Sequence, residues 1–438
     1  MKLKNTMLRF VIGLCLLCAA LPAYAQEKQQ PDAAAPNEEV ILQWNRVLGQ
    51  TLAIPGAQPP TVNPVRSFAM MHLAMFDAVN SIDRTYTPYL TDVRDSRNAS
   101  MRAAAAQAAR DVLMALYPNQ EAIFKEEFAN SLIGIPPGAA RRGRAVGQIV
   151  AQSMLAKRAN DGWNAPWTPY VLPPTPGNWQ EVSPGPYPGF AVFTNFPGVT
   201  PFALTQNTQF LPAPPPALTS AEYAEGLNEV KELGRVNSAS RTANQTQTAF
   251  LWANPPVSDG LMFNVVRTTA LARNNSTVEN ARLFALIFMA YHDALQTTFT
   301  SQYTYGRWRP VTAIRRADED GNPDTLPDAG WESLLGPQGT PPHPSYASNA
   351  SSASSSLATT LALFYGRDDV QFQINFGGTP NTIRNYRSFS ALTNEIARSR
   401  VFGGVHFPFD IAAGQSAGHS VANYVFLNYL TPRRCNVE

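Results

Sequence analysis

Residues 62–82 constrain the fold more than any other stretch, because apolar side chains point to most sides of a helix drawn through them. The apolar residues include Phe68, Met71, Leu73, Phe76 and Val79. A helix that is apolar on most sides is stable only when other elements surround it. Residues 280–296 carry a similar pattern, so we predict that they also form a helix in the core.

Helical spacing and helix-start signals predict the elements that surround this core. The predicted helices cover residues 38–52, 96–116, 118–133, 137–159, 223–233, 352–364 and 410–430. Capping boxes that begin at Thr219 and Ser276 mark the starts of two helices. We find no strand pattern of consequence, and the sequence therefore predicts an all-α protein.

Residues 162–217 have a different texture, rich in Pro, Gly and aromatic side chains, in which neither a helix nor a strand can run far. A disordered linker would contain fewer Trp, Phe and Tyr residues. We therefore predict an ordered loop wrapped on the helical bundle. No polar linker or charge block divides the chain, so residues 38–438 are expected to form one domain that contains this loop.

The N-terminus has the features of a secretory signal peptide over residues 1–25. Basic residues precede an apolar run, and Ala-Tyr-Ala at 23–25 is a small-x-small cleavage site. We expect cleavage near Ala25, export to the periplasm or the medium, and a flexible tail over residues 26–37. Among the cysteines only Cys435 lies outside this leader, which excludes a cysteine-ligated metal centre.

The charge balance argues against a nucleic acid or an anionic membrane as a partner. The chain has 34 Lys and Arg residues against 32 Asp and Glu, and three of the basic residues lie in the leader. The exported chain is therefore close to neutral. No later apolar run is long enough to span a bilayer, so no transmembrane segment is expected.

Residues 399–410 hold a set of side chains that suits a tetrahedral oxyanion. Arg400 supplies a rigid fork of donors, and Gly403 opens a glycine pair that permits close approach of the backbone. His406 can bond the central atom while Asp410 orients its other nitrogen. Two structural alternatives stay open: a histidine in a glycine loop is often structural, and Asp410 could be a helix N-cap.

Two further segments supply candidate donors. Arg309 precedes Pro310, which can open a helix, so a second guanidinium would lie at a helix entrance. Ser348 ends a proline-rich loop before the predicted helix 352–364. A hydroxyl and free backbone N–H groups at a helix start form an anion site, although Ser348 could also simply cap the helix.

The order of these motifs resembles the vanadium-dependent haloperoxidase and type 2 phosphatidic acid phosphatase superfamily. The chain has Arg-Pro at 309–310, the pattern Pro-x-Tyr-x-Ser at 344–348, and Ser-Arg-x-x-Gly-Gly-x-His at 399–406 with an Asp four residues later. The resemblance extends over nearly the whole exported chain. It implies an all-helical double bundle.

The resemblance also implies a role for each matching residue. The oxygens of vanadate or phosphate would be bound by Arg309, Arg400, Ser348 and the backbone of Asn349 and Gly403. His406 would be the vanadate ligand in a peroxidase, or the phosphorylated nucleophile in a phosphatase. Asp410 would support His406.

Three signature positions depart from the family pattern. Gln302 stands where the family has a lysine, and Ser-Asn-Ala at 348–350 replaces Ser-Gly-His. Asn349 tolerates a glycine-like backbone better than most residues. Ala350 cannot transfer a proton, and the loss of such a group typically costs about 10²–10⁴ in rate. Gln302 can still donate a hydrogen bond to the oxyanion, but it lacks the charge of a lysine.

Two neighbouring side chains could compensate for these changes. Arg307 could supply the charge of the missing lysine, and His343 could act as a displaced acid. The alternative for both residues is a role in loop packing. His292 and His419 are expected to be structural.

The sequence therefore leaves three alternative functions open. The first is an exported haloperoxidase with vanadate as its cofactor and hydrogen peroxide and halide as substrates, weak or altered because of Gln302 and Ala350. The second is a phosphohydrolase that uses His406 as the nucleophile on a phosphate ester. The third is a non-catalytic homologue that binds phosphate or vanadate.

Overall fold

The computed structural model describes residues 38–57, 65–94, 96–182, 191–253, 255–377 and 381–433. The signal peptide and tail expected over residues 1–37, and Cys435, lie outside the described residues. The described chain is mostly helical, which confirms the all-α prediction. No described helix is both long and apolar enough to cross a membrane.

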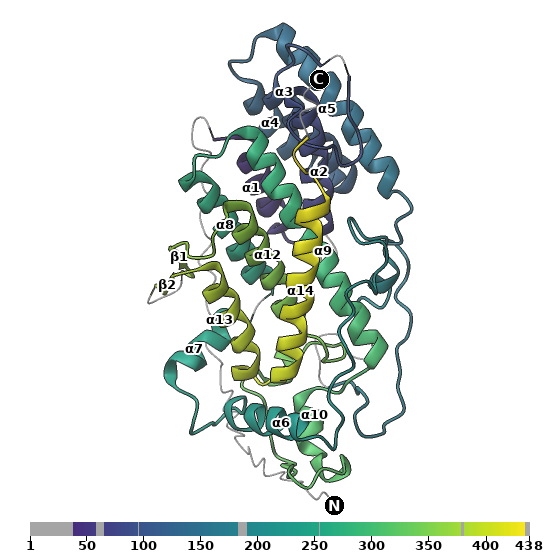
Figure 1. Cartoon of the computed structure of the whole chain (residues 1–438), viewed down its shortest axis with the longest axis vertical. Coiled ribbons are helices and arrows are strands. Elements are labelled where there is room, and N and C mark those ends of the chain that lie inside the picture. The colour runs from purple at the N-terminus through teal and green to yellow at the C-terminus, as the bar shows by residue number, and fades with distance from the viewer. Residues whose placement is uncertain are drawn as a thin grey trace, which may run out of the picture.

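The N-terminal helices gather at the upper end of the molecule (Figure 1). They are α1 (Val40–Leu52), α2 (Val65–Asp83), α3 (Met101–Leu116), α4 (Glu121–Leu132) and α5 (Pro137–Arg158). Helix α2 is buried on nearly every side, and it packs on α3, α5 and α9. This enclosure is what the apolar character of residues 62–82 predicted.

A second group of helices packs around α9 (Thr277–Tyr305), which extends from the first group toward the lower end (Figure 1). Helices α12 (Asn349–Tyr365) and α14 (Pro408–Asn428) pack directly on α9, and α13 (Phe389–Phe402) packs on α12 and α14. The other elements are α6 (Ala221–Leu233), α7 (Ala243–Leu251), α8 (Pro255–Ala272), α10 (Pro310–Arg315), α11 (Gly336–Gly339), β1 (Phe372–Asn375) and β2 (Ile383–Tyr386). Short 3-10 helices cover Pro118–Gln120, Phe196–Gly198 and Ala317–Glu319.

Small side chains let α12 and α14 lie in close contact. A Cβ atom added to Gly414 would lie 2.4 Å from the carbonyl oxygen of Ser348, and one added to Gly418 would lie 2.1 Å from that of Ser352. Any side chain at these glycines would therefore push the two helices apart. This contact matters for function because α12 begins after Ser348 and α14 begins after His406.

Four sequence predictions need correction. The helix predicted over 96–116 begins at Met101, because Ser100 is its N-cap and accepts a hydrogen bond from Ala103 N. Ser220, rather than Thr219, caps α6. The helix predicted over 280–296 continues to Tyr305, so Gln302 lies on it. Strands β1 and β2 form an antiparallel pair that the sequence pattern did not indicate.

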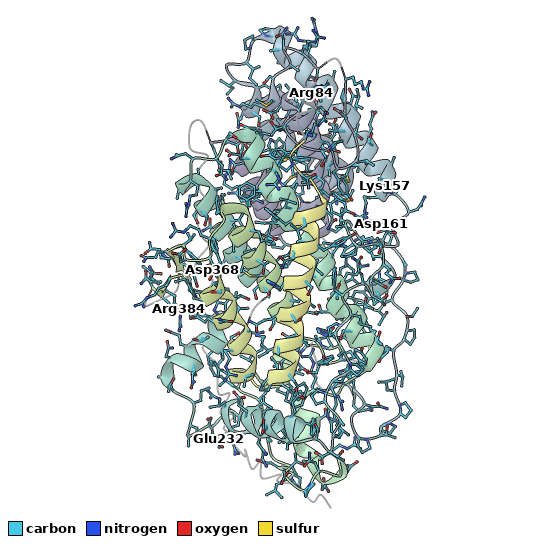
Figure 2. The ribbon with its side chains drawn as sticks, viewed as in Figure 1. Arg84, Lys157, Asp161, Glu232, Asp368 and Arg384 are labelled. Carbon is cyan, nitrogen blue, oxygen red and sulfur yellow. The ribbon has the colours of Figure 1, made fainter. Side chains whose placement is uncertain are left out.

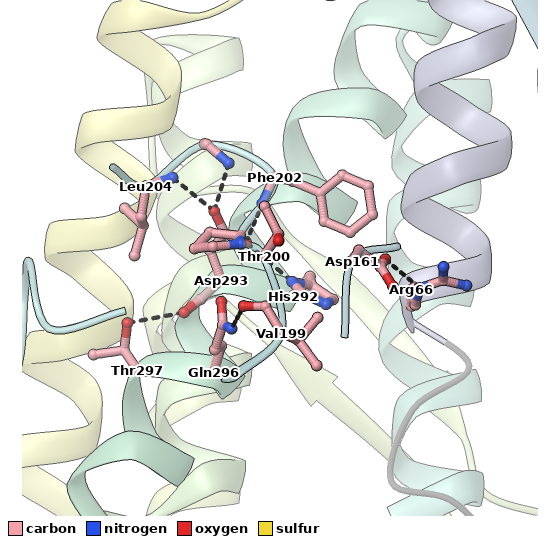
Figure 3. A network of polar contacts seen from close by, with 12 residues as sticks. Arg66, Asp161, Val199, Thr200, Phe202, Leu204, His292, Asp293, Gln296 and Thr297 are labelled. Carbon is pink, nitrogen blue, oxygen red and sulfur yellow. Dashed lines mark hydrogen bonds and ion pairs between the residues drawn. The ribbon is translucent and has the colours of Figure 1, made fainter. Parts of the chain in front are cut away.

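The described part of the proline-rich segment 162–217 is tied to the helical bundle by hydrogen bonds. Trp179 N donates to Gly306 O, and the hydroxyls of Tyr305 and Tyr346 donate to the carbonyl oxygens of Pro212 and Ala213. Residues 202–204 of the segment are anchored by Asp293, a buried residue of α9 (Figure 3). Its carboxylate accepts hydrogen bonds from three consecutive backbone N–H groups, those of Phe202, Ala203 and Leu204, at 2.7–3.0 Å.

Asp293→Ala is expected to lower the free energy of unfolding by about 2–3 kcal/mol, because three buried N–H groups would lose their acceptor. Urea denaturation followed by circular dichroism measures this change. The control Asp83→Ala removes an exposed carboxylate and should change stability by less than about 0.5 kcal/mol. Equal stability of the two variants would show that Asp293 does not anchor the segment.

Candidate oxyanion site

Three segments from different parts of the second bundle meet at one buried site. The first is the turn after α9, which ends at Gly306 in the left-handed conformation (φ 57°) and leads into Arg309. Pro310 then opens α10, which places Arg309 at the N-cap as predicted. The second segment is the loop before α12, and the third connects α13 to α14 through His406.

His406 is held from both sides of its ring. Its Nδ1 lies 3.0 Å from Asp410 Oδ2, and its Nε2 lies 3.1 Å from Arg309 Nη1. A carboxylate only accepts and a guanidinium only donates, so the proton belongs on Nδ1 and the lone pair on Nε2. Burial, together with the charge of Arg309, lowers the pKa of His406 to about 4. The ring is therefore neutral near pH 7, with a lone pair on Nε2.

Asp410 contacts His406, but it is not the N-cap of α14, because Phe407 holds that position and Asp410 lies three residues farther along. Besides facing His406, its Oδ2 accepts a hydrogen bond of 3.0 Å from Phe407 N, the N-cap residue of α14. The carboxylate is completely buried. It thereby fixes the ring of His406 relative to the helix that follows.

Arg309 and Arg400 are buried cations without a carboxylate partner within 4.0 Å in the described part of the chain. Arg309 donates to the carbonyl oxygens of His343 and Val405, and Arg400 donates to Ser399 Oγ and to the carbonyl oxygen of Trp252. Burial lowers the pKa of Arg309 to about 9 and that of Arg400 to about 10.

Two buried guanidinium groups are costly unless negative charge offsets them. Asp410 is the acidic group that interacts with Arg309. One carboxylate cannot neutralise two guanidinium groups, and the electrostatic balance of the site therefore favours an additional bound anion.

The start of α12 adds a hydroxyl to this site. Ser348 is the N-cap, and its Oγ accepts from Ser351 N at 3.4 Å and lies 3.0 Å from Ser351 Oγ. Asn349 is the first residue of the helix, where a backbone N–H has no partner within the helix. Gly403 does not offer its N–H, because that group donates to Ser399 O in the last turn of α13.

Gln302 braces the loop before α12. Its Nε2 donates to Ala347 O at 2.7 Å and to Asn349 Oδ1 at 3.1 Å. Its Oε1 is buried and has no hydrogen-bond partner among the described residues. Gln302 stands where the superfamily has a lysine. Its amide nitrogen is neutral and already donates to two groups of the loop, and its Oε1 has no donor among the described residues.

The structure brings His343 into the site and leaves Arg307 outside its hydrogen-bond network. Nδ1 of the buried His343 lies 3.1 Å from Arg309 Nη2 and 3.2 Å from Pro344 O. The guanidinium can only donate and the carbonyl oxygen can only accept, so Nδ1 can form a hydrogen bond with one of these two groups at a time. Burial and the charge of Arg309 lower the pKa of His343 well below its usual value. Arg307 instead donates to Pro216 O at 2.8 Å and holds the proline-rich segment.

The remaining histidines have other partners. His292 lies 3.0 Å from Asp293, beside the anchor of the proline-rich segment, and His72 lies 3.0 Å from Asn45 in the first bundle. His419 is an exposed residue of α14 that contacts Thr359 Oγ1.

Ser345 is a site residue that the sequence reasoning missed. Its Oγ donates to Asp410 Oδ2 and lies 3.5 Å from His406 Nδ1. The hydroxyl is completely buried, so this contact helps to fix the carboxylate. The available signal was the position of Ser345 in the same loop as Ser348, but a serine in a proline-rich loop is too common to be singled out.

Ser345→Ala is expected to weaken oxyanion binding about 10-fold to 100-fold, because Asp410 would lose a hydrogen bond that orients it. Equilibrium dialysis with vanadate measures the affinity. Ser355→Ala, at a buried serine of α12 that donates to Gln415 O, is the matched control and should keep wild-type affinity. Unchanged affinity in Ser345→Ala would show that Asp410 needs no support from this hydroxyl.

Known proteins resemble this chain in sequence and in fold. Residues 282–432 match a family model described as the second helical-bundle domain of vanadium chloroperoxidase. The chain is 27% identical to vanadium chloroperoxidase from Curvularia inaequalis, over 86% of this chain and 80% of that protein.

Two solved structures have the same fold. A bacterial vanadium-dependent iodoperoxidase superposes with a TM-score of 0.72 and 22% identity, over 90% of this chain and 97% of that chain. A holo bacterial vanadium-dependent chloroperoxidase superposes with a TM-score of 0.67 and 19% identity, over 88% and 96% of the two chains.

Proposed function

We propose, because the chain belongs to the vanadium haloperoxidase superfamily, that it is an exported peroxidase that oxidises halide with hydrogen peroxide at a vanadate held by His406. The observation that carries this proposal is the pair of buried guanidinium groups, Arg309 and Arg400, beside a neutral imidazole. Export rests on the signal-peptide features of residues 1–25.

The residues of the site fit a tetrahedral oxyanion such as vanadate. His406 Nε2 would supply the bond to the central atom, while Arg309, Arg400 and the hydroxyl of Ser348 would bind the oxygens. Clusters of three or more His, Cys, Asp or Glu side chains that could hold a metal cation do not occur among the described residues. Bound vanadate would supply the activation of hydrogen peroxide toward halide.

The other residues of the site determine how fast such an enzyme can work. Asp410 keeps the proton on Nδ1 of His406, and Ser345 keeps Asp410 in place. Burial and the charge of Arg309 keep His343 neutral, so at neutral pH it is a weak base and carries no imidazolium proton to donate. Gln302 adds no charge and Ala350 cannot transfer a proton. We therefore propose a slow peroxidase in place of an inactive homologue.

The test is halogenation of a phenolic dye by the purified protein with orthovanadate, hydrogen peroxide and either iodide or bromide. We expect slow halogenation that requires both vanadate and peroxide. No halogenation at any pH, with vanadate demonstrably bound, would contradict the proposal.

A second candidate function uses the same atoms. Phosphate is also a tetrahedral oxyanion, and the lone pair of His406 Nε2 could attack a phosphate ester. In that case, brief incubation with a phosphate monoester should leave phosphohistidine on the wild-type protein and none on His406→Ala. Halogenation without any phosphohistidine would favour the peroxidase.

A further inference from the structure

A cavity lined mainly by arginines lies beyond the C-terminal end of α14, whereas His406 precedes the N-terminal end of that helix. Its volume is about 440 Å³, and its lining residues are Arg84, Asp92, Arg94, Ser96, Arg97 and Arg433. We call it the arginine pocket. Figure 2 shows Arg84 near the upper end, where α2 ends. His406 precedes α14 and Arg433 follows it, so the 21 residues of that helix, about 30 Å, separate the pocket from the oxyanion site.

Two chain segments that are distant in the sequence hold the pocket together. The segment after α2 and the C-terminal segment form a bridge between Tyr86 and Pro432. Arg433 N donates to Thr85 O at 2.9 Å, and Arg433 Nε donates to Tyr86 O at 2.7 Å. These hydrogen bonds therefore fix Arg433 next to the segment that carries Arg84.

The pocket has more positive than negative charge among its lining residues. Among the described residues of the lining, Asp92 is the one acidic side chain, and its two oxygens lie 3.0 Å from Arg433 Nη2 and 4.0 Å from Arg84 Nη1. Arg94 and Arg97 form no hydrogen bond or ion pair with the described residues. Asp92 thus forms a hydrogen bond with Arg433 and only approaches Arg84, whose guanidinium donates to Val93 O, so the described lining carries an excess of positive charge.

We propose that the arginine pocket binds a ligand with a multiply charged phosphate or sulfate group. Guanidinium groups bind such oxyanions through paired N–H donors, and a concave surface of one charge concentrates anions. Four guanidinium groups line the pocket, more than one small oxyanion can engage with paired donors, which favours a ligand with two linked groups, such as a diphosphate. This site is independent of the proposed peroxidase activity.

Calorimetric titration with inorganic pyrophosphate tests the pocket. The variant Arg94→Ala with Arg97→Ala removes two exposed charges of the pocket, and Arg141→Ala with Lys157→Ala removes two exposed charges on α5 as the matched control. We expect the wild type and the control to bind pyrophosphate at the pocket with equal affinity. The pocket variant should bind at least about tenfold more weakly.

Orthophosphate serves as the second probe, because one group can engage fewer arginines than two linked groups. It should bind the pocket more weakly than pyrophosphate. The absence of any binding event that depends on Arg94 and Arg97 would overturn the proposal. An equal loss in both double variants would show general charge attraction and would overturn it as well.

Discussion

His406→Ala is expected to lower vanadate affinity on the order of 10³-fold and to abolish halogenation. The imidazole supplies the bond to the central atom, and the loss of about 4 kcal/mol corresponds to about three powers of ten in affinity. Arg309 and Arg400 would still attract the anion, so weak binding should persist. Equilibrium dialysis gives the affinity and dye halogenation gives the rate.

The matched control for this variant is His419→Ala. His419 lies on α14, the helix that follows His406, but it is exposed and contacts Thr359. The control should keep both the vanadate affinity and the rate of the wild type. If His406→Ala binds vanadate as tightly as the control, the imidazole is not the ligand.

Ala350→His is expected to raise the halogenation rate at least about 100-fold, because it returns a proton-transfer group to the start of α12. Ala350 is half-buried and follows Asn349, whose side chain contacts Gln302. A new imidazole there would follow directly on Asn349, the first residue of α12. The rate constant should rise while the vanadate affinity stays close to that of the wild type.

Ala362→His is the matched control for this gain of activity. Ala362 is also a half-buried residue of α12, twelve residues farther along, which is about 18 Å along the helix axis. It should leave the rate unchanged. A rate in Ala350→His no higher than that in the control would mean that the missing histidine is not what limits the enzyme.

The half of the site that depends on local sequence could be predicted. His406 lies just before α14 and Asp410 lies in its first turn, so a separation of four residues keeps their side chains close. The proline after Arg309 fixed that residue at the entrance of α10 in the same way. The N-cap role of Ser348 follows from the same local chemistry.

The half that depends on loop conformation could not be predicted. Ser345 meets Asp410 across 65 positions in the sequence, and His343 meets Arg309 across 34. No local rule connects residues so far apart. For the same reason the sequence offered both Arg307 and His343 as compensating residues. Only the fold shows that His343 contacts Arg309 and that Arg307 donates to Pro216 O instead. Gly403 was predicted to donate its N–H to the oxyanion, but that N–H donates to Ser399 O at the end of α13.

The packing of helices around α2 followed from its apolar pattern, whereas the short strands did not. Strand β1 has only one buried residue, Ile374, and β2 has only Tyr386. Such short segments with one buried side chain each give no period that can be read. Their pairing depends on the position of the chain between α12 and α13.

The most direct test of the oxyanion site is a crystal structure of the protein soaked in orthovanadate, with anomalous scattering used to locate vanadium. The site described above predicts one strong vanadium peak at bonding distance from His406 Nε2, with its oxygens facing Arg309, Arg400 and Ser348. Vanadium bound elsewhere, or no vanadium at His406 in crystals that take up the anion, would contradict the assignment of this site.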